Sequence, residues 1–396
     1  MKHATDQATL PQSTKISLHS TQEEERKEKK KKKKHSYRSR PWQRRRFSLQ
    51  ALAPSAAVTV PINMDYLVRE FSGHGVSFES IGESCVVEMA LDNGSLAKLM
   101  LPSGLITSYK PFMWHGTTLE VLHTTVSEGE DGEAVIQGGV SMDFKCINDG
   151  GMPWSPSNWT LRNVSGSSDK SIQIELGSAA PENMAEFKCA VTLRHNLLAS
   201  EFTVINRRSS SLQLLGCVMN HLTVSTPDAT YAVGLQGSNY HGRRPINTEF
   251  SIIPPDSDKK ISSTSGGESW AQKAARGLFS SWETRDGMKD EAVEEDSMIE
   301  ESEGEEADDY AHMTEEMCRT YTSAPREFTV IDRGRRNSVA VGRSGFDDIY
   351  VLSPGSKHDW YGKYAYICIG PTMQTPVSLA PGGTWKGAQY LHNPNL

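Results

Sequence analysis

Six cysteines are the side chains with the widest chemical repertoire in this chain of 396 residues, and they are spread singly along it. No two of them form a Cys-x-x-Cys pair, and none has a histidine at zinc-ligand spacing. The sequence also lacks the motifs of iron–sulfur and flavin sites, so it predicts no metal and no redox cofactor. Scattered cysteines in apolar surroundings are typical of buried free thiols in a reducing compartment. They are Cys85, Cys146, Cys189, Cys217, Cys318 and Cys368.

His221 lies near the end of the apolar run LQLLGCVMNHLTVS, which predicts a β-strand. A histidine can donate or accept a proton near neutral pH. A short loop follows, and then come Gly234, Leu235, Gly237 and Tyr240. This arrangement resembles the hexose-6-phosphate 1-epimerases of the galactose-mutarotase superfamily, in which a catalytic histidine ends a strand before a Gly-Leu-x-Gly-x-x-Tyr turn.

Three further segments resemble that family and follow in its order. Residues 137–140 are similar to its Arg-Gly-Gly segment, 350–355 to its Trp-Asn-Pro strand end, and 379–383 to its closing Leu-x-Pro-Gly turn. The resemblance spans roughly residues 80–396 once an insertion is removed. It implies a large antiparallel β-sandwich of the galactose-mutarotase type.

The resemblance also identifies the residues that would open a sugar ring. In the family a glutamate takes the proton of the sugar O1, and a histidine, here His221, protonates the ring oxygen from the other side. The glutamate follows a strand whose counterpart here is 364–369, so its position is Gly370. Glycine has no group that takes a proton, and losing one positioned base costs about 10²–10⁴ in rate. The resemblance therefore predicts that the chain is not an enzyme and that His221 is vestigial.

The cations that would bind a sugar phosphate are missing as well. Gln137 stands where the family has an arginine, and 149–153 lack the histidine and arginine of its His-Gly-Phe-Ala-Arg segment. Asp347, Asp348 and Asp359 are the nearby acids that could replace the base, and we expect them in polar turns. Two alternatives remain. The chain could bind a sugar or sugar phosphate without chemistry, or it could be an active hexose-6-phosphate 1-epimerase with a relocated base.

The elements that position these residues are predicted to be strands. From about residue 58 the chain is a series of short apolar runs separated by Gly, Pro, Asn and Asp, which predicts an all-β fold. Helical periodicity is nearly absent from these runs, which argues against a βαβ fold. The predicted sandwich covers 58–396 and is interrupted by an insertion over 250–320.

The insertion has two distinct parts. The segment ESWAQKAARGLFSSW predicts a short amphipathic helix over 268–283, with Trp270, Leu278 and Trp282 on one face. Such a helix could pack on its own sandwich, dock a partner through its tryptophans, or lie on a membrane surface. The run 286–316 has a net charge of −14 and is predicted to be disordered.

Residues 1–54 are predicted to form a disordered basic leader, and the first 50 carry a net charge of +10. The second half of this leader is rich in Arg and Ser and ends in small residues, which is typical of an organelle transit peptide. The acidic EEERKE segment departs from that pattern, and a basic arm for nucleic acid is the alternative. Because the poly-lysine run has no interleaved aromatic residues, the sequence favours the transit peptide and no nucleic-acid partner.

Within the superfamily, the chain is most similar to a plant chloroplast group, the sandwich-fold stromal subunits of the photosynthetic NADH dehydrogenase-like (NDH) complex. The His221 strand, 360–376, 381–394, the acidic insertion and the transit-like leader carry this resemblance. The group includes the second subunit of subcomplex B and its paralogue among the NDH-dependent cyclic electron flow proteins. The resemblance implies a non-catalytic structural or assembly subunit that supports cyclic electron flow around photosystem I.

Location and partners follow from the same resemblance. It implies a peripheral place on the stromal side of the thylakoid membrane, with other subunits of subcomplex B and the photosystem I supercomplex as partners. No run of about 18 or more apolar residues occurs in the sequence, so we expect no transmembrane helix. Contact with the membrane would then come only through partners.

Overall fold

The computed structural model describes residues 62–129, 134–148, 153–179, 185–254, 303–307, 310–356 and 365–394. Some of the predictions concern other residues. The predicted leader over 1–54, the predicted helix over 268–283 with Trp270, Leu278 and Trp282, and Asp359 lie outside the described residues.

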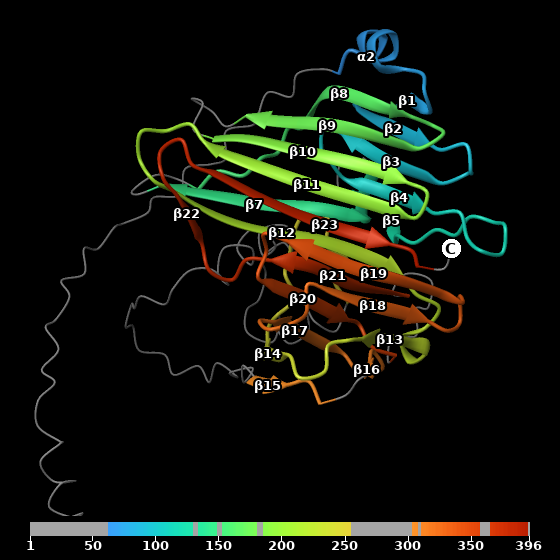
Figure 1. Cartoon of the computed structure of the whole chain (residues 1–396), viewed down its shortest axis with the longest axis vertical. Helices are drawn as coiled ribbons and strands as arrows, with labels where there is room; N and C mark the ends of the chain where they lie inside the picture. Colours follow the sequence, from blue (N-terminus) through green and yellow to red (C-terminus); the bar gives the residue numbers. More distant parts are fainter. Residues whose placement is uncertain are drawn as a thin grey trace, which may run out of the picture. The chain divides into compact units, whose positions relative to one another are not determined.

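Among the described residues, one short α-helix, α2 (Met64–Phe71), precedes the strands (Figure 1). Asn63 begins this helix, because its side chain accepts a hydrogen bond from the backbone nitrogen of Tyr66 at 3.0 Å. The helix buries Leu67 and leaves Tyr66 and Val68 each 45% exposed. No helix in the described part of the chain is both long and apolar enough to cross a bilayer.

Two large antiparallel sheets contain most of the strands (Figure 1). The first sheet has the order β1 (Val76–Ile81), β2 (Ser84–Ala90), β3 (Leu96–Leu101), β4 (Ile106–Lys110), β7 (Val140–Asn148), β12 (Leu212–Thr223), β21 (Tyr366–Thr372), β20 (Asp348–Ser353), β17 (Met317–Tyr321), β14 (Asn239–Gly242) and β15 (Glu303–Glu305), with β22 (Val377–Leu379) paired to β12. The second sheet has the order β16 (Tyr310–His312), β13 (Thr230–Val233), β18 (Glu327–Asp332), β19 (Asn337–Ser344), β23 (Thr384–His392), β11 (Leu197–Asn206), β10 (Ala185–Arg194), β9 (Ser171–Ala179) and β8 (Thr160–Ser167).

Two smaller elements complete the described chain. Strands β5 (Thr124–Glu128) and β6 (Ala134–Gly138) form a hairpin of their own, and η2 (Pro227–Ala229) is a single 3₁₀ turn. The predicted all-β sandwich is thus confirmed.

The strands form where apolar residues alternate with polar ones. In β10, Phe187, Cys189, Val191 and Leu193 are buried, and the residues between them point away from the core. Alternation of this kind buries one face of each strand, so the two sheets pack through these faces.

An aromatic cluster fills the space between the sheets. Phe144 of β7 in the first sheet contacts Phe187 and Phe202 of the second, with ring centroids 5.7 and 5.2 Å apart. Phe346 packs edge-on against Trp385 of β23 at 5.1 Å. Aromatic side chains bury large areas, so this cluster is a main source of stability between the layers.

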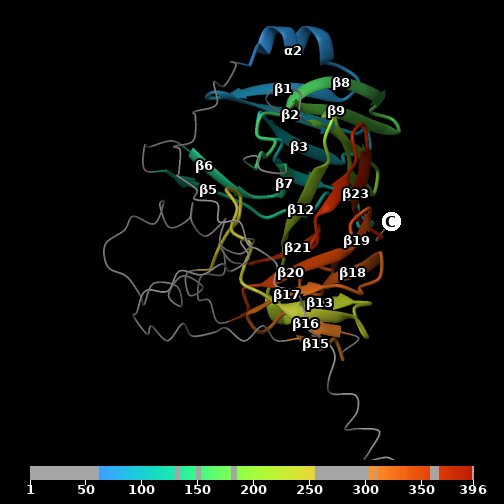
Figure 2. The ribbon, with the colours of Figure 1, turned by 90° about the vertical axis from the view of Figure 1, so that its left-hand side faces the viewer.

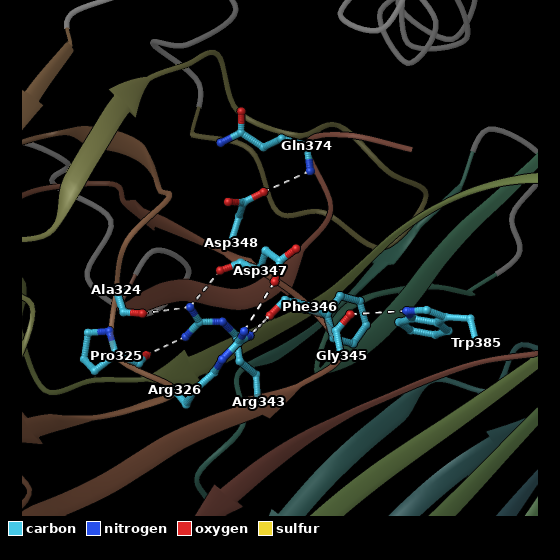
Figure 3. A network of polar contacts seen from close by, with 10 residues as sticks. All are labelled: Ala324, Pro325, Arg326, Arg343, Gly345, Phe346, Asp347, Asp348, Gln374 and Trp385. Atoms are coloured by element: carbon cyan, nitrogen blue, oxygen red, sulfur yellow. Dashed lines mark hydrogen bonds and ion pairs between the residues drawn. The ribbon is translucent and has the colours of Figure 1, made fainter. Parts of the chain in front are cut away.

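A buried arginine links the ends of β19 and β20 (Figure 3). The guanidinium of Arg343 donates to the carbonyls of Pro325 at 2.6 Å, Ala324 at 3.0 Å and Asp347 at 2.9 Å. Arg343 is 5% exposed, and burial lowers its pKa to about 10. Its neighbour Arg326 contacts Phe346 and Asp347 from the surface.

The acidic run is more ordered at its end than the sequence predicts. Residues 303–305 form β15 at the edge of the first sheet, and residues 310–312 form β16 at the edge of the second. Glu306 is buried and accepts hydrogen bonds from Arg319 at 2.8 Å and Tyr321 at 2.7 Å. The prediction of disorder is therefore wrong for these residues, because a charged run can be ordered where buried partners neutralise its charges. The insertion predicted over 250–320 likewise includes strand β17 of the sandwich.

All six cysteines are free thiols, as the sequence predicts. Five are buried, and Cys318 is half-buried. Burial raises the pKa of Cys146 and of Cys217 to about 12, and that of Cys318 to about 11.

Candidate functional site

His221 lies in the middle of the first sheet, on β12 between β7 and β21. Its backbone nitrogen donates to the carbonyl of Gly139 at 2.8 Å, and its carbonyl accepts from the backbone nitrogen of His123 at 2.8 Å. In β12 the residues at 217, 219 and 221 share the face of the sheet that points away from the aromatic core. The backbone therefore directs the imidazole of His221 to the face of the first sheet opposite to the aromatic core.

A stretch of chain lies directly over this face. Residues 246–252, here called the covering segment, follow β14 and run between β17 and the β5–β6 hairpin, as the yellow trace in Figure 2 shows. Ile252 is 4% exposed and packs among apolar and sulfur-containing side chains of the sheet, namely Cys217, Met219, Tyr350, Leu352, Tyr366 and Cys368. Ile246 packs against the same cluster.

Backbone hydrogen bonds hold the covering segment in place. The nitrogen of Ile246 donates to the Tyr350 hydroxyl at 3.2 Å, and the nitrogen of Gly138 donates to the carbonyl of Phe250 at 2.8 Å. The Tyr366 hydroxyl donates to the carbonyl of Ile252. Within the segment, the Ser251 hydroxyl donates to the carbonyl of Ile246 at 3.0 Å. These bonds join the segment to β20, β6 and β21, and its own polar groups are largely satisfied.

The covering segment also forms a hydrogen bond to the imidazole of His221. The backbone nitrogen of Ile252 donates to Nε2 of His221 at 3.4 Å, and the His221 ring is fully buried. Tyr366 lies beside it, with ring centroids 5.5 Å apart, and stacks on His123 at 5.3 Å. A sugar cannot reach Nε2 in this structure, because the main chain already uses that nitrogen.

Burial keeps His221 neutral. Removal of the His221 ring from solvent lowers its pKa to about 4. The nearby His123 also lowers this pKa, and the carbonyl of Gly139 raises it by a smaller amount than burial lowers it. An Nε2 that accepts a hydrogen bond must also be unprotonated. The contact geometry and the pKa thus agree on a neutral histidine.

Acid should destabilise the protein through this histidine. The folded-state pKa of about 4 lies below the ordinary value of 6.5, so the unfolded chain takes up the proton first and stability falls as the pH drops from 6.5 towards 4. Between pH 7.5 and pH 5.0 the wild type should lose about 2 kcal/mol more than His221→Gln, measured by urea unfolding. Equal losses in both proteins would show that the ring is not buried as a neutral group.

Gly370 lies on β21 opposite Tyr350 of β20, and its backbone is fully enclosed. A Cβ atom at this position would lie 2.7 Å from the carbonyl carbon of Val218, and nearer still to its oxygen. Any side chain here would point into the neighbouring strand and not across a cleft towards His221. The position predicted for the base therefore has no room for one.

Two of the acids that could replace the base, Asp347 and Asp348, lie among the described residues. Asp347 is exposed, and Asp348 accepts from the backbone nitrogen of Gln374 at 3.1 Å (Figure 3). Burial raises the pKa of the Asp348 carboxyl. Neither residue has a contact with His221 among the described residues.

Sequence reasoning missed Asp143, an acid on the same face of the sheet as His221. It pairs with Cys217, and burial raises the pKa of its carboxyl. The alternation in VSMDFKC would have placed it there. Because it pairs with a residue four positions from His221, it lies roughly 13 Å away along the strand, too far to act on the same sugar ring.

Comparisons with known proteins bear on the family and the fold of the chain. No family model matches the sequence. The chain is 42% identical over 344 residues to the Arabidopsis thaliana protein NDH-dependent cyclic electron flow 5, a match that covers 86% of this chain and 85% of the relative. Two solved structures share the fold. A protein described as a mutarotase, YeaD from Salmonella typhimurium, has a TM-score of 0.54 at 12% identity and covers 80% of this chain and 93% of its own. A galactose mutarotase-like protein from Clostridium acetobutylicum has a TM-score of 0.50 at 13% identity and covers 81% and 98%.

The relative matches 86% of this chain, and the solved structures share the sandwich. The chain therefore belongs to the family of NDH-dependent cyclic electron flow 5, built on a galactose mutarotase-like fold.

Proposed function

We propose that this chain is a non-catalytic structural subunit of the chloroplast NDH complex that supports cyclic electron flow around photosystem I. The relative in Arabidopsis thaliana, whose name states a role in NDH-dependent cyclic electron flow, supports the assignment to that process. The observation that carries the non-catalytic part is the bond between the main chain of Ile252 and the imidazole of His221.

Three features argue against sugar chemistry at this face. His221 is buried and neutral, Gly370 has no space for a side chain, and Asp143 is too distant to act as a partner. The same closure argues against the alternative of a sugar-phosphate binding protein, because the covering segment fills the space above the imidazole.

The finer parts of the proposal concern location and neighbours. We place the chain on the stromal side of the thylakoid membrane, bound peripherally through other subunits of subcomplex B and near photosystem I. The transit-like composition of the leader supports entry into the chloroplast.

The proposal is tested in a plant line that lacks the endogenous copy and expresses the full chain with an affinity tag. Thylakoid membranes are solubilised and separated on a native gel, and the bands are identified by mass spectrometry. We expect the tagged chain to migrate with NDH subunits, and the line to regain NDH-dependent electron flow. Migration only as a free protein would contradict the proposal.

A second measurement addresses the enzymatic alternative. The purified full chain is added to glucose 6-phosphate, and exchange between the two anomers is followed by NMR. We expect the rate in buffer alone. Acceleration that is lost in His221→Gln would establish epimerase activity and refute the non-catalytic assignment.

A further inference from the structure

A groove lies on the outer face of the second sheet, on the side that points away from the aromatic core. Its volume is about 370 Å³, which is within the usual range for small-molecule sites. Strands β8, β9, β10, β11 and β23 lie side by side here and provide its lining (Figure 1). The groove is therefore separate from the face of the first sheet that carries His221.

One row of residues forms the floor of the groove. The members of this row lie directly opposite one another on successive strands, so their side chains share the outer face. They are Ser165, Gln173, Thr192, Ala199 and Tyr390. Thr192 is 8% exposed and Ala199 is 5% exposed, although both point away from the core. Longer side chains around them must therefore enclose the floor, which makes this face hollow.

The floor offers hydrogen bonds and room for a flat ring. Nε2 of Gln173 donates to Oγ1 of Thr192 at 3.1 Å, which holds both side chains in place. This bond leaves the Gln173 carbonyl oxygen and the Thr192 hydroxyl proton without a partner among the described residues. Ala199 lies between Thr192 and Tyr390, and its methyl group takes up little of the space above it. A planar ring fits over such a small residue next to an aromatic one.

Opposite charges stand at the two ends of the groove. Arg194 is exposed and lies opposite Ser171 of β9 and Leu197 of β11. Glu201 is also exposed and lies four residues beyond Leu197, roughly 13 Å along the strand. Neither charged side chain has a hydrogen bond or an ion pair in the part of the chain that the structure describes. A ligand that satisfies both must carry an anion at one end and hydrogen-bond donors at the other.

This requirement excludes several simple ligands. A neutral polyol would leave both charges without a counter-charge, and inorganic phosphate would leave Glu201 unused. The two charged groups of a free amino acid are bonded to one carbon, too close together to reach both ends. A guanidinium beside a hydroxyl donor, as in Arg194 and Ser171, suits a phosphate group. A carboxylate such as that of Glu201 accepts from the amino group of a nucleobase.

We infer that the groove binds a nucleoside monophosphate whose base carries an amino group. The phosphate lies on Arg194 and Ser171. The base lies over Ala199 beside Tyr390, and its amino group donates to Glu201. This inference goes beyond the proposed function and does not depend on it, because the groove belongs to the isolated chain.

Calorimetric titration of the purified full chain tests the two ends of the groove with matched ligands. We expect AMP and CMP to bind with a Kd below about 1 mM. IMP and UMP have an oxygen in place of the amino group, and they should bind about ten-fold or more weakly. Adenosine and inorganic phosphate each lack one end of the ligand, so each should bind at least about ten-fold more weakly than AMP.

Substitutions assign each end to a residue. Arg194→Gln should weaken AMP about ten-fold or more and leave adenosine unchanged. Glu201→Gln should abolish the preference for AMP over IMP. Arg162→Gln is the matched control, because Arg162 is an exposed arginine beside Gly177 of the same sheet but outside the lining of the groove. It should bind AMP like the wild type. All three variants should keep the wild-type unfolding midpoint, since their side chains are exposed.

The outcomes that would overturn the inference are separate from those that bear on the NDH complex. Absence of AMP and CMP binding at about 10 mM would refute the site. Equal loss of affinity in Arg162→Gln and Arg194→Gln would show general attraction of anions and no built site. Equal binding of AMP and IMP by the wild type would refute the contact between the base and Glu201. None of these results changes the migration of the chain with NDH subunits, so the proposed function is judged independently.

Discussion

Gly370→Ala should lower the free energy of unfolding by about 4 kcal/mol or more. The added methyl group would lie 2.7 Å from the carbonyl carbon of Val218, so β21 and β12 would have to separate in the centre of the first sheet. Gly370→Glu restores the carboxylate that the epimerase resemblance predicts at this position, yet it should give insoluble protein without epimerase activity. Urea unfolding followed by tryptophan fluorescence, and the soluble yield, measure the two effects.

Gly342→Ala is the matched control. Gly342 also lies within a strand, β19, but a Cβ atom there would meet its nearest neighbours at 3.5 Å, an ordinary contact. Its effect should stay within about 1 kcal/mol. A folded Gly370→Glu protein that interconverts glucose 6-phosphate anomers would contradict the packing argument and the closure of the face around His221.

Arg343→Met should destabilise the chain by about 3–5 kcal/mol. Methionine keeps much of the length of the side chain but donates no hydrogen bond, so the carbonyls of Ala324, Pro325 and Asp347 would lose their shared donor (Figure 3). Buried acceptors without a donor are costly because water does not replace the lost bond. Urea unfolding of the full chain at neutral pH gives the size of the effect.

The neighbouring Arg326→Met serves as the comparison in the same network. The Arg326 side chain is 62% exposed, and its ion pair with Asp347 at 3.3 Å is open to solvent. Its loss should cost less than about 1 kcal/mol. Similar losses for the two variants would mean that Arg343 is solvated and does not hold β19 and β20 together.

The features that depend on local pattern could be predicted from the sequence. Alternation such as that of β10 needs only neighbouring residues, so the amino-acid order alone is enough to infer the strands and the sandwich. The apolar run around His221 predicted that this residue lies on a strand, and the missing acid at Gly370 came from the resemblance alone.

The covering segment could not be predicted in this way. Its contacts with the sheet join residues far apart in the chain: Ile252 bonds to His221 across 31 positions and to Tyr366 across 114. The same limit applies to Glu306, which appeared as one acid in a charged run. Its burial depends on Arg319 and Tyr321, which the fold brings to it.

The buried thiols have a consequence for a member of the family of NDH-dependent cyclic electron flow 5. Peroxide reacts with the thiolate and hardly with the thiol, so a cysteine senses oxidants only if it is both ionised and reachable. With a pKa of about 11, roughly one Cys318 in a thousand is ionised at pH 8, and Cys146 and Cys217, each with a pKa of about 12, are ionised less. These thiols are therefore poor targets for peroxide at the pH values at which the protein is folded.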